Sequence, residues 1–241
     1  MADVSLVALP YDCGRRAERM GRGPSHLIEG GLESHLKALK HEVELAAVQL
    51  PEAFYSEGQA LVELQRRGVP LVRDRLAKKR RVLLLSGNCG PAALTAVSAL
   101  GAARTGVIWF DAHADFNTPE TSTSGFLDGM ALAILTGRCW PGLAGSFDNF
   151  TPVPEENVVL VGARDLDPAE ANALDQSSIT HIPPDRLEML APAIERMAAK
   201  VDSLYVHLDV DVLDETEGRA NTYACRGGVS ADSLYAALKL L

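Results

Sequence analysis

Five short apolar runs, separated by segments of helix length, set the strongest limit on how this 241-residue chain can fold. Each run is nearly continuous rather than alternating, which is typical of parallel strands covered by helices on both faces. The runs are residues 4–10, 81–87, 105–113, 157–165 and 203–211, and the helix candidates are residues 24–40, 58–79, 91–103, 126–137, 167–178 and 192–201. The pattern predicts an α/β fold: a single three-layer α/β/α domain over residues 1–241, with one mostly parallel, doubly wound sheet. Residues 140–157 are rich in proline, glycine and asparagine and are expected to form a surface loop.

Composition and charge exclude several classes of partner. The net charge is -9, and no long run of lysine and arginine offsets it, so we expect no nucleic acid as a partner. No apolar stretch approaches the roughly 20 residues that cross a bilayer, so we expect no membrane association. Residues 1–10 indicate a first strand rather than a signal peptide, because they lack a basic leader and a long apolar core. The four cysteines form no C-x-x-C pair, which favours a reducing, cytoplasmic setting.

Polar and charged residues gather at the points where the apolar runs end. In open parallel sheets, ligands bind beyond the carboxyl ends of the strands. The residues at those ends are Asn88 and Cys89; Asp111, His113, Asp115 and Asn117; Arg164, Asp165 and Asp167; and Asp209 and Asp211. Four consecutive strand ends therefore direct carboxylates, an imidazole and a thiol toward one edge.

The D-x-H-x-D and D-x-D spacings predict a metal centre. Residues two apart in an extended chain point the same way, so Asp111, His113 and Asp115 can converge, and so can Asp209 and Asp211. Four gathered carboxylates need counter-charge, because like charges about 4 Å apart repel by about 4 kcal/mol even at an effective dielectric near 20. Shared protons would neutralise some of them, and two divalent cations would neutralise all. Oxygen ligands with one imidazole suit Mn²⁺ or Mg²⁺ better than tetrahedral zinc.

Two alternatives stay open for these acidic residues. A lone aspartate after a strand is commonly a helix N-cap or a turn residue. A magnesium phosphatase also uses a D-x-D pair, although it has no need of the H-x-D extension.

The sequence resembles the ureohydrolase family, which includes arginase, agmatinase and formiminoglutamase. The motifs that carry the resemblance are "GRGP" (21–24), "SGNCG" (86–90), "DAHADFNTP" (111–119), "TSG" (123–125), "GARDLDPAE" (162–170) and "HLDVDVLD" (207–214). The motif "SGNCG" stands where the family has G-G-D-H-S. The motif "HLDVDVLD" is similar to the family's S-x-D-x-D-x-x-D-P without its proline. The resemblance covers nearly the whole chain.

The resemblance implies an arginase-like α/β enzyme with two manganese ions that hydrolyses guanidino groups to urea-type products. Asp111 and Asp209 would bridge both metals, and His113 and Asp211 would bind one of them. Asp115 would bind the other metal and hydrogen-bond a bridging hydroxide. That hydroxide exists near neutral pH because the metals lower the pKa of bound water. It would attack the guanidino carbon of arginine or a close derivative such as N-hydroxyarginine.

The resemblance also implies a substrate site and an oligomer. Asn117 and Ser124 match positions that hold the α-carboxylate of an amino-acid substrate, and Asp167 and Glu170 match positions that hold its α-amino group. The alternatives are turn chemistry for the first pair, and a helix N-cap with its capping-box partner for the second. The family is commonly a trimer or hexamer, so we expect a homo-oligomer.

Three departures from the family pattern bear on activity. Cys89 stands where the family has a histidine that binds one of the two metals. Its softer thiolate would favour zinc or iron over manganese at that metal position. The alternative is that Cys89 is only a small buried residue. Asp128 stands where arginase has a histidine thought to carry the proton, and Phe126 replaces an asparagine. Asp128 could take that catalytic role or be a first-turn carboxylate of a helix. The family's C-terminal strand, with its guanidinium-binding glutamate, and the helix after it have no counterpart.

Two further functions remain open beside arginine or N-hydroxyarginine hydrolysis. One is a catalytically degenerate relative that binds metal or serves a structural role. The other is an amidinohydrolase of the formiminoglutamase or agmatinase type.

Overall fold

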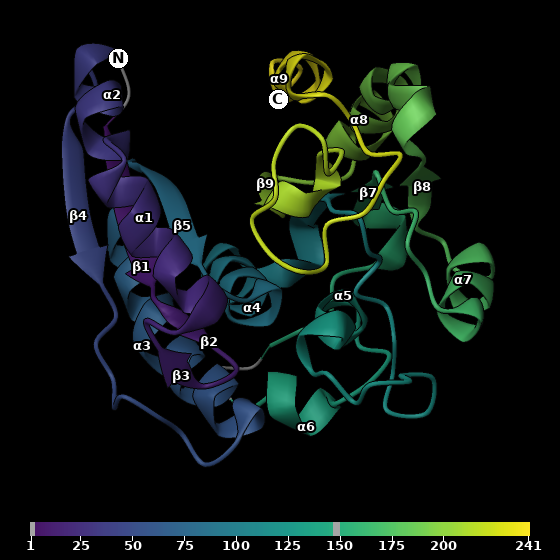
Figure 1. Ribbon diagram of the computed structural model, residues 1–241, viewed down its shortest axis with the longest axis horizontal. Helices are drawn as coiled ribbons and strands as arrows, with labels where there is room; N and C mark the ends of the chain where they lie inside the picture. The colour runs from purple at the N-terminus through teal and green to yellow at the C-terminus, as the bar shows by residue number, and fades with distance from the viewer. Residues whose placement is uncertain (1–2, 147–149) are drawn as a thin grey trace. The chain divides into compact units, whose positions relative to one another are not determined.

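The computed structural model describes residues 3–146 and 150–241, which form two compact units (Figure 1). The first unit comprises Met1–Leu100 and Gly142–Phe150, and the second comprises Gly101–Pro141 and Thr151–Leu241. Part of the predicted loop at residues 140–157 falls on residues 147–149, outside the described residues. The single domain over residues 1–241 stays a prediction.

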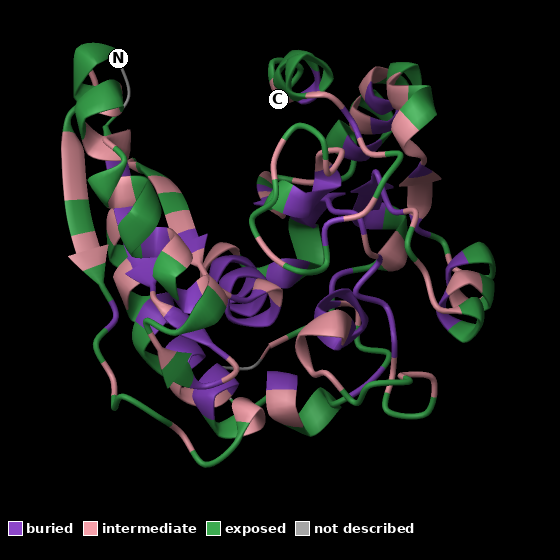
Figure 2. Ribbon diagram, viewed as in Figure 1, coloured by how far each residue is buried: buried purple, intermediate pink, exposed green. Residues whose placement is uncertain are grey.

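The first unit is built on a parallel sheet with the strand order β4–β1–β5. Its strands are β1 (Val4–Leu9), β4 (Val43–Ala47) and β5 (Arg81–Ser86). Every residue of β1 is buried, including Ser5, as its nearly continuous apolar run predicts (Figure 2). The long helix α3 (Glu57–Ala77) packs against α4 (Cys89–Leu100), which follows β5.

The helix predicted over residues 24–40 is interrupted. The structure has the short helix η1 (Arg19–Arg22), then α1 (Gly23–Glu29) and α2 (Leu32–Ala38). The break falls at Gly31, whose φ of 97° lies in the left-handed region. Glycine adopts that conformation without the clash of a Cβ atom. The short strands β2 (Tyr11–Asp12) and β3 (Arg15–Arg16) pair nearby in the first unit.

The second unit is built on a parallel sheet with the strand order β8–β7–β6–β9. Its strands are β6 (Thr105–Phe110), β7 (Val158–Val161), β8 (Thr180–Ile182) and β9 (Ser203–Leu208). The chain runs outward from β6 through β7 to β8 and then returns to the other side of β6 as β9. The strand order therefore reverses between β6 and β9, and such a reversal is where open parallel sheets bind ligands.

The two faces of β6 have different surroundings. Ile108 and Phe110 belong to an apolar core with residues of α8 (Leu190–Ala198) and α9 (Ala231–Leu238). Because side chains alternate along a strand, Val107 and Trp109 point to the opposite face. Trp109 is fully buried there. One face of this sheet is thus an ordinary core, while the other presents polar groups described below.

The remaining elements are short. The second unit contains η2 (Ala102–Arg104), η3 (Asp128–Met130), α5 (Ala131–Leu135), η4 (Glu155–Asn157), α7 (Pro168–Asp175), η5 (Pro184–Met189) and η6 (Val210–Val212). Another helix, α6 (Pro141–Ala144), lies within the predicted loop at residues 140–157. Within residues 3–146 and 150–241, every helix is too short or too polar to span a bilayer.

The predicted fold class is confirmed: parallel strands alternate with helices. Besides the interrupted helix at residues 24–40, two details of the sheets differ from the sequence-based expectation. The parallel strands are described in two sheets, one in each unit, rather than in one. Strands β4 and β8 were not predicted, because each is short and partly exposed and neither forms a continuous apolar run.

We expect Gly162→Ala to lower the free energy of unfolding by about 2 kcal/mol or more, from left-handed strain and overpacking together. Gly162 has a φ of 95°, and a Cβ atom there would lie 2.6 Å from Cγ2 of Val212. Urea unfolding measures the effect. The matched control is Gly218→Ala, where a Cβ atom would meet nothing within 4 Å. Equal stabilities for the two variants would contradict this packing.

Candidate functional site

Asp111 directly follows β6 and is held in place by two donors. The indole Nε1 of Trp109 donates to its Oδ2 at 3.1 Å, and the backbone N–H of His113 donates to its Oδ1 at 2.8 Å. The residue is 1% exposed. A carboxylate buried this deeply is tolerated only with strong partners.

His113 and Asp211 lie next to Asp111. The Nδ1 atom of His113 is 3.3 Å from Oδ1 of Asp111 and 3.5 Å from Oδ2 of Asp211. Ligand atoms of these three residues all lie within 4.8 Å of one another, which makes them a group able to hold a metal ion. The backbone N–H of Ala112 fixes the other oxygen of Asp211 at 3.2 Å. The structure therefore places side chains of the D-x-H and D-x-D motifs next to one another.

Asp209 occupies the turn between β9 and η6. Its Oδ1 accepts a hydrogen bond from the backbone N–H of Asp211 at 2.8 Å, so it caps the short helix. This is the N-cap role that the sequence left open. Both aspartates of the D-x-D motif thus lie at the carboxyl end of β9.

Asp115 combines strain with an unpartnered oxygen. Its φ of 49° lies in the left-handed region, which costs a residue with a Cβ atom about 1–2 kcal/mol. Its backbone oxygen accepts hydrogen bonds from Leu132 and Ala133 at the start of α5, which explains how the strained conformation is held. The side chain is buried, and Oδ2 has no hydrogen-bond partner among the described residues. Strain of this kind is concentrated at functional sites.

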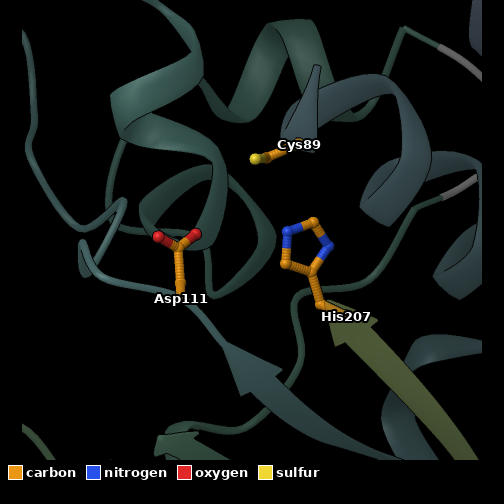
Figure 3. A group of neighbouring side chains, drawn as sticks. All are labelled: Cys89, Asp111 and His207. Atoms are coloured by element: carbon orange, nitrogen blue, oxygen red, sulfur yellow. The ribbon is translucent and has the colours of Figure 1, made fainter. Parts of the chain in front are cut away.

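His207 was missed by the sequence analysis. It is the register partner of Trp109, and the two rings stack with centroids 3.7 Å apart. The hydroxyl of Tyr205 lies 2.9 Å from Nδ1 of His207, while Nε2 has no partner among the described residues. A ring nitrogen of His207 lies within 4.8 Å of a carboxylate oxygen of Asp111. Figure 3 shows His207 on β9 and Asp111 on the segment that directly follows β6.

Burial and mutual repulsion raise the pKa values of Asp111, Asp115 and Asp209. Burial raises the pKa of Asp111 to about 6, with a further contribution from the charge of Asp211, against the lowering effect of His113. Burial also raises the pKa values of Asp115 and Asp209 well above the ordinary range, helped by the charge of Asp111. Ionised carboxylates in this arrangement therefore need a positive partner.

The pKa values of His113 and His207 are shifted in opposite directions. Burial acts to lower the pKa of His113, but its hydrogen bond to Asp111 and the charges of Asp111 and Asp211 outweigh burial and raise the pKa to about 9. Burial lowers the pKa of His207 to about 3, which keeps that imidazole neutral. A neutral imidazole is the form that binds metals.

The donor atoms fit divalent metal ions. Asp111, Asp115, Asp209 and Asp211 supply carboxylate oxygens, and His113 supplies an imidazole. The buried, unpartnered Oδ2 of Asp115 is an atom that a cation would satisfy. An oxygen-rich set with imidazole suits manganese. Among the described residues, these side chains therefore form a candidate metal-binding group.

Cys89 begins α4 in the first unit (Figure 3), and its role as a metal ligand stays a prediction. The residue before it has a structural task. Asn88 accepts a hydrogen bond from the backbone N–H of Cys13 at 2.7 Å and donates to Oδ1 of Asp12 at 3.3 Å. These contacts hold the turn after β5 against β2.

The residues predicted to bind substrate form local hydrogen bonds. Asn117 donates to Oδ2 of Asp167 at 3.2 Å. Ser124 accepts from the backbone N–H of Phe126 at 3.2 Å, as a turn residue does. Asp167 and Glu170 form a capping box at the start of α7. The turn and capping alternatives are thus present, and the substrate-binding roles stay predictions.

Glu170 links this capping box to the metal-site loop. Its Oε1 accepts from the backbone N–H of Phe116 at 2.8 Å, and it is 4% exposed. Burial raises its pKa. Because Phe116 directly follows Asp115, Glu170 helps to fix the loop that carries the strained aspartate.

Asp128 lies in the first turn of η3, and its charge contributes to the raised pKa of Asp115. Its catalytic role stays a prediction. Aromatic residues border this region: Tyr223 meets His113 edge-on at 6.3 Å and stacks with Phe126 at 6.1 Å. Tyr223 lies in a loop, where no periodic pattern of the sequence marks it.

Arg164, which the sequence placed at a strand end, has a supporting role. Its guanidinium donates hydrogen bonds to the backbone oxygens of Gly162, Asp211, Val212, Leu213, Cys225 and Arg226. These bonds tie the segment that carries Asp211 to the loop near residue 225. The guanidinium therefore fixes the backbone of the site.

Comparison with known sequences gives one family. The Arginase family matches residues 2–241. The arginase of Staphylococcus aureus (strain COL) is 32% identical over 259 residues, which cover 99% of this chain and 84% of that protein. The arginase of Bacillus caldovelox is 29% identical over 259 residues, which cover 100% of this chain and 86% of that protein.

Solved structures show the same fold. The native arginase from Bacillus caldovelox has a TM-score of 0.89 at 25% identity and covers 100% of this chain and 86% of its own. The formimidoylglutamase from Bacillus subtilis has a TM-score of 0.72 at 17% identity and covers 99% of this chain and 74% of its own. The second likeness concerns the fold alone. The predicted arginase-like fold is confirmed.

We expect the metal-free protein to lose stability as the pH rises. A group whose pKa is higher in the folded state stabilises the fold below its unfolded pKa, and this contribution is lost as the pH rises through the folded pKa. For Asp111 that window runs from 3.8 to about 6. His113 acts in the same direction between 6.5 and about 9, and so do Asp115 and Asp209, whose pKa values are raised well above the ordinary range. His207, whose pKa is lowered to about 3, acts in the opposite direction up to 6.5, and the three aspartates with His113 outweigh it.

Urea unfolding in the presence of a chelator tests this expectation. The free energy of unfolding should be at least about 1 kcal/mol lower at about pH 7.5 than at about pH 5. Asp111→Asn should reduce that difference, because one of the groups no longer titrates. Stability that rises over this interval, unaffected by the substitution, would contradict the assigned shifts.

Proposed function

We propose that this chain, which belongs to the arginase family, is a metal-dependent amidinohydrolase that cleaves a C–N bond of a guanidino group. The substrate proposed is arginine or a close derivative such as N-hydroxyarginine. The cofactors proposed are two divalent ions, with manganese as the expected ion and zinc or iron as the alternatives beside Cys89.

One observation carries the proposal. Ligand atoms of Asp111, His113 and Asp211 lie within 4.8 Å of one another at the point where the strand order of the sheet reverses. Asp115 adds a buried carboxylate oxygen that lacks a hydrogen-bond partner among the described residues. Both features are expected of a centre that holds cations.

The residues divide between two ions in the proposed centre. Asp111 and Asp209 would contact both, His113 and Asp211 would hold one, and Asp115 and Cys89 would hold the other. When bound, a pair of divalent ions lowers the pKa of water between them and so supplies hydroxide near neutral pH.

The chain's own carboxylates would handle the protons of the hydrolysis. The unpartnered Oδ2 of Asp115 is placed to accept a hydrogen bond from the attacking water and to orient it. Asp128, whose charge acts on Asp115, would pass a proton to the departing amine nitrogen. One water is consumed, the guanidino carbon gains its oxygen, and the broken C–N bond leaves a urea-type product and an amine.

The substrate end of the site favours an amino acid over a plain amine. Asn117 and Ser124 would bind an α-carboxylate, and Asp167 and Glu170 would bind an α-amino group. Asn117 and Asp167 are already joined by a hydrogen bond of 3.2 Å, so the two halves of such a site are neighbours. The hydrogen bonds that now occupy these side chains would be shared with the ligand.

A catalytically degenerate relative is the second candidate function. Asp128 and Cys89 stand where the family has histidines, and these departures favour it. Metal binding without guanidino hydrolysis would be its signature. Hydrolysis of a formimino substrate or of agmatine would instead place the chain with other members of the family.

The setting of the protein completes the proposal. A homo-oligomer, trimeric or hexameric, is proposed from the resemblance alone. A cytoplasmic location is proposed from the cysteine pattern, and Cys13, Cys89, Cys139 and Cys225 form no disulfide among the described residues.

We expect manganese-loaded protein to release urea from arginine, or hydroxyurea from N-hydroxyarginine, faster than it acts on agmatine or formiminoglutamate. Asp115→Asn should lower the rate by about 10²- to 10⁴-fold, because the group that orients the water is lost. A colorimetric urea assay and ammonia detection measure the panel. Asp232→Asn, an exposed aspartate of α9, is the matched control and should retain full activity. No product from any substrate would reject hydrolysis in favour of the degenerate relative.

We expect Cys89→His to raise manganese affinity by about tenfold, because imidazole suits this ion better than thiolate does. Equilibrium dialysis followed by elemental analysis gives the metal content of both proteins. Zinc affinity, measured in parallel, should change less. Unchanged affinities for both ions would show that residue 89 is not a ligand.

A further inference from the structure

We infer that His207 is a metal ligand of this chain, through Nε2, at one of the two ions that Asp111 would contact. The inference rests on the proposed function and deepens it. It assigns to the centre a second imidazole that the motifs did not identify.

The first support is the fixed position of the ring. His207 on β9 is the register partner of Trp109 on β6, and their rings stack at 3.7 Å with an interplanar angle of 19°. The residue is 6% exposed. A buried ring clamped in this way presents its free edge in one direction, as a metal ligand must.

The second support is the hydrogen bonding of the two ring nitrogens. Nδ1 lies 2.9 Å from the Tyr205 hydroxyl, whereas Nε2 has no partner among the described residues. A buried polar atom without a partner is unfavourable, because it has lost its hydrogen bonds to water. If Nδ1–H donates to the Tyr205 oxygen, the lone pair of Nε2 is available. Metal-binding histidines are commonly fixed by such a bond from the other nitrogen.

The third support is the distance to an acidic ligand. A ring nitrogen of His207 lies within 4.8 Å of a carboxylate oxygen of Asp111. Two atoms that each bind one ion at about 2.1 Å lie no more than about 4.2 Å apart. A small adjustment brings both onto the same ion. Trp109 donates to Oδ2 of Asp111 at 3.1 Å, so one indole positions both groups.

The sequence supplies an independent support. Residue 89 is a cysteine where the family motif has a histidine, and residue 207 is a histidine where the motif has a serine. An imidazole absent at one position is thus matched by one gained at another. Added nitrogen favours manganese, iron or zinc over magnesium, which prefers oxygen ligands.

The test is metal binding by the whole chain, with Mn²⁺ and Zn²⁺ as the probes. His207→Phe keeps a ring on Trp109 but has no ligand atom. Tyr205→Phe keeps the imidazole and removes only the partner of Nδ1. His181→Phe is the matched control, because His181 lies on the same sheet and its Nε2 is bonded to the backbone oxygen of Ala163. Equilibrium dialysis gives stoichiometry and affinity, and X-ray absorption at the zinc edge reports nitrogen ligands.

We expect the unsubstituted protein and His181→Phe to bind two ions. His207→Phe should bind one of them at least about tenfold more weakly and lose nitrogen scattering, and Tyr205→Phe should show a smaller loss. Near-ultraviolet circular dichroism verifies folding, and Tyr205→Phe decides the matter if His207→Phe does not fold. Two ions bound with unchanged affinity in these variants would overturn the role of His207 alone. No metal bound by the unsubstituted protein would overturn the proposed function as well.

Discussion

The repulsion among the aspartates at the ends of β6 and β9 is the constraint on which the rest of the structure depends. Asp111, Asp115 and Asp211 are buried, and Asp209 is partly buried beside them. Water cannot screen charges in such a place, and the protein offers one nearby imidazolium, His113, as compensation. The cations of the proposed centre would resolve this conflict, and without them the carboxylates should hold protons near neutral pH.

Several contacts hold the mutually repelling aspartates that follow β6 and β9 close together. The apolar core beneath β6 and β9 places both strand ends at the same edge of the sheet. Arg164 secures the segment after β9 through its bonds to backbone oxygens. Glu170 secures the loop after β6, where Asp115 sits in a strained conformation. Stability from packing therefore supports a site that is itself destabilising, which is the usual relation between scaffold and active site.

The sequence indicates which acidic residues follow β6 and β9 because this information is local. Strand ends are marked by apolar runs, and the alternation of side chains brings Asp111 and His113 together. His207 could not be found in this way. Its significance depends on cross-strand pairing with Trp109 and on an unsatisfied nitrogen, which only coordinates reveal. The helix break at Gly31 was not predicted for a similar reason, because an apolar pattern carries no information about a left-handed φ. For Asp167 and Glu170, the sequence left two alternatives open, helix capping and substrate binding. The structure contains the capping box.

The most direct test of the account is crystallographic. Crystals grown from manganese-replete solution, with diffraction measured on both sides of the manganese absorption edge, locate the ions by their anomalous signal. The account predicts two peaks among the aspartates that follow β6 and β9. A well-ordered site in which those carboxylates turn away from one another around water, without an anomalous peak, would contradict it.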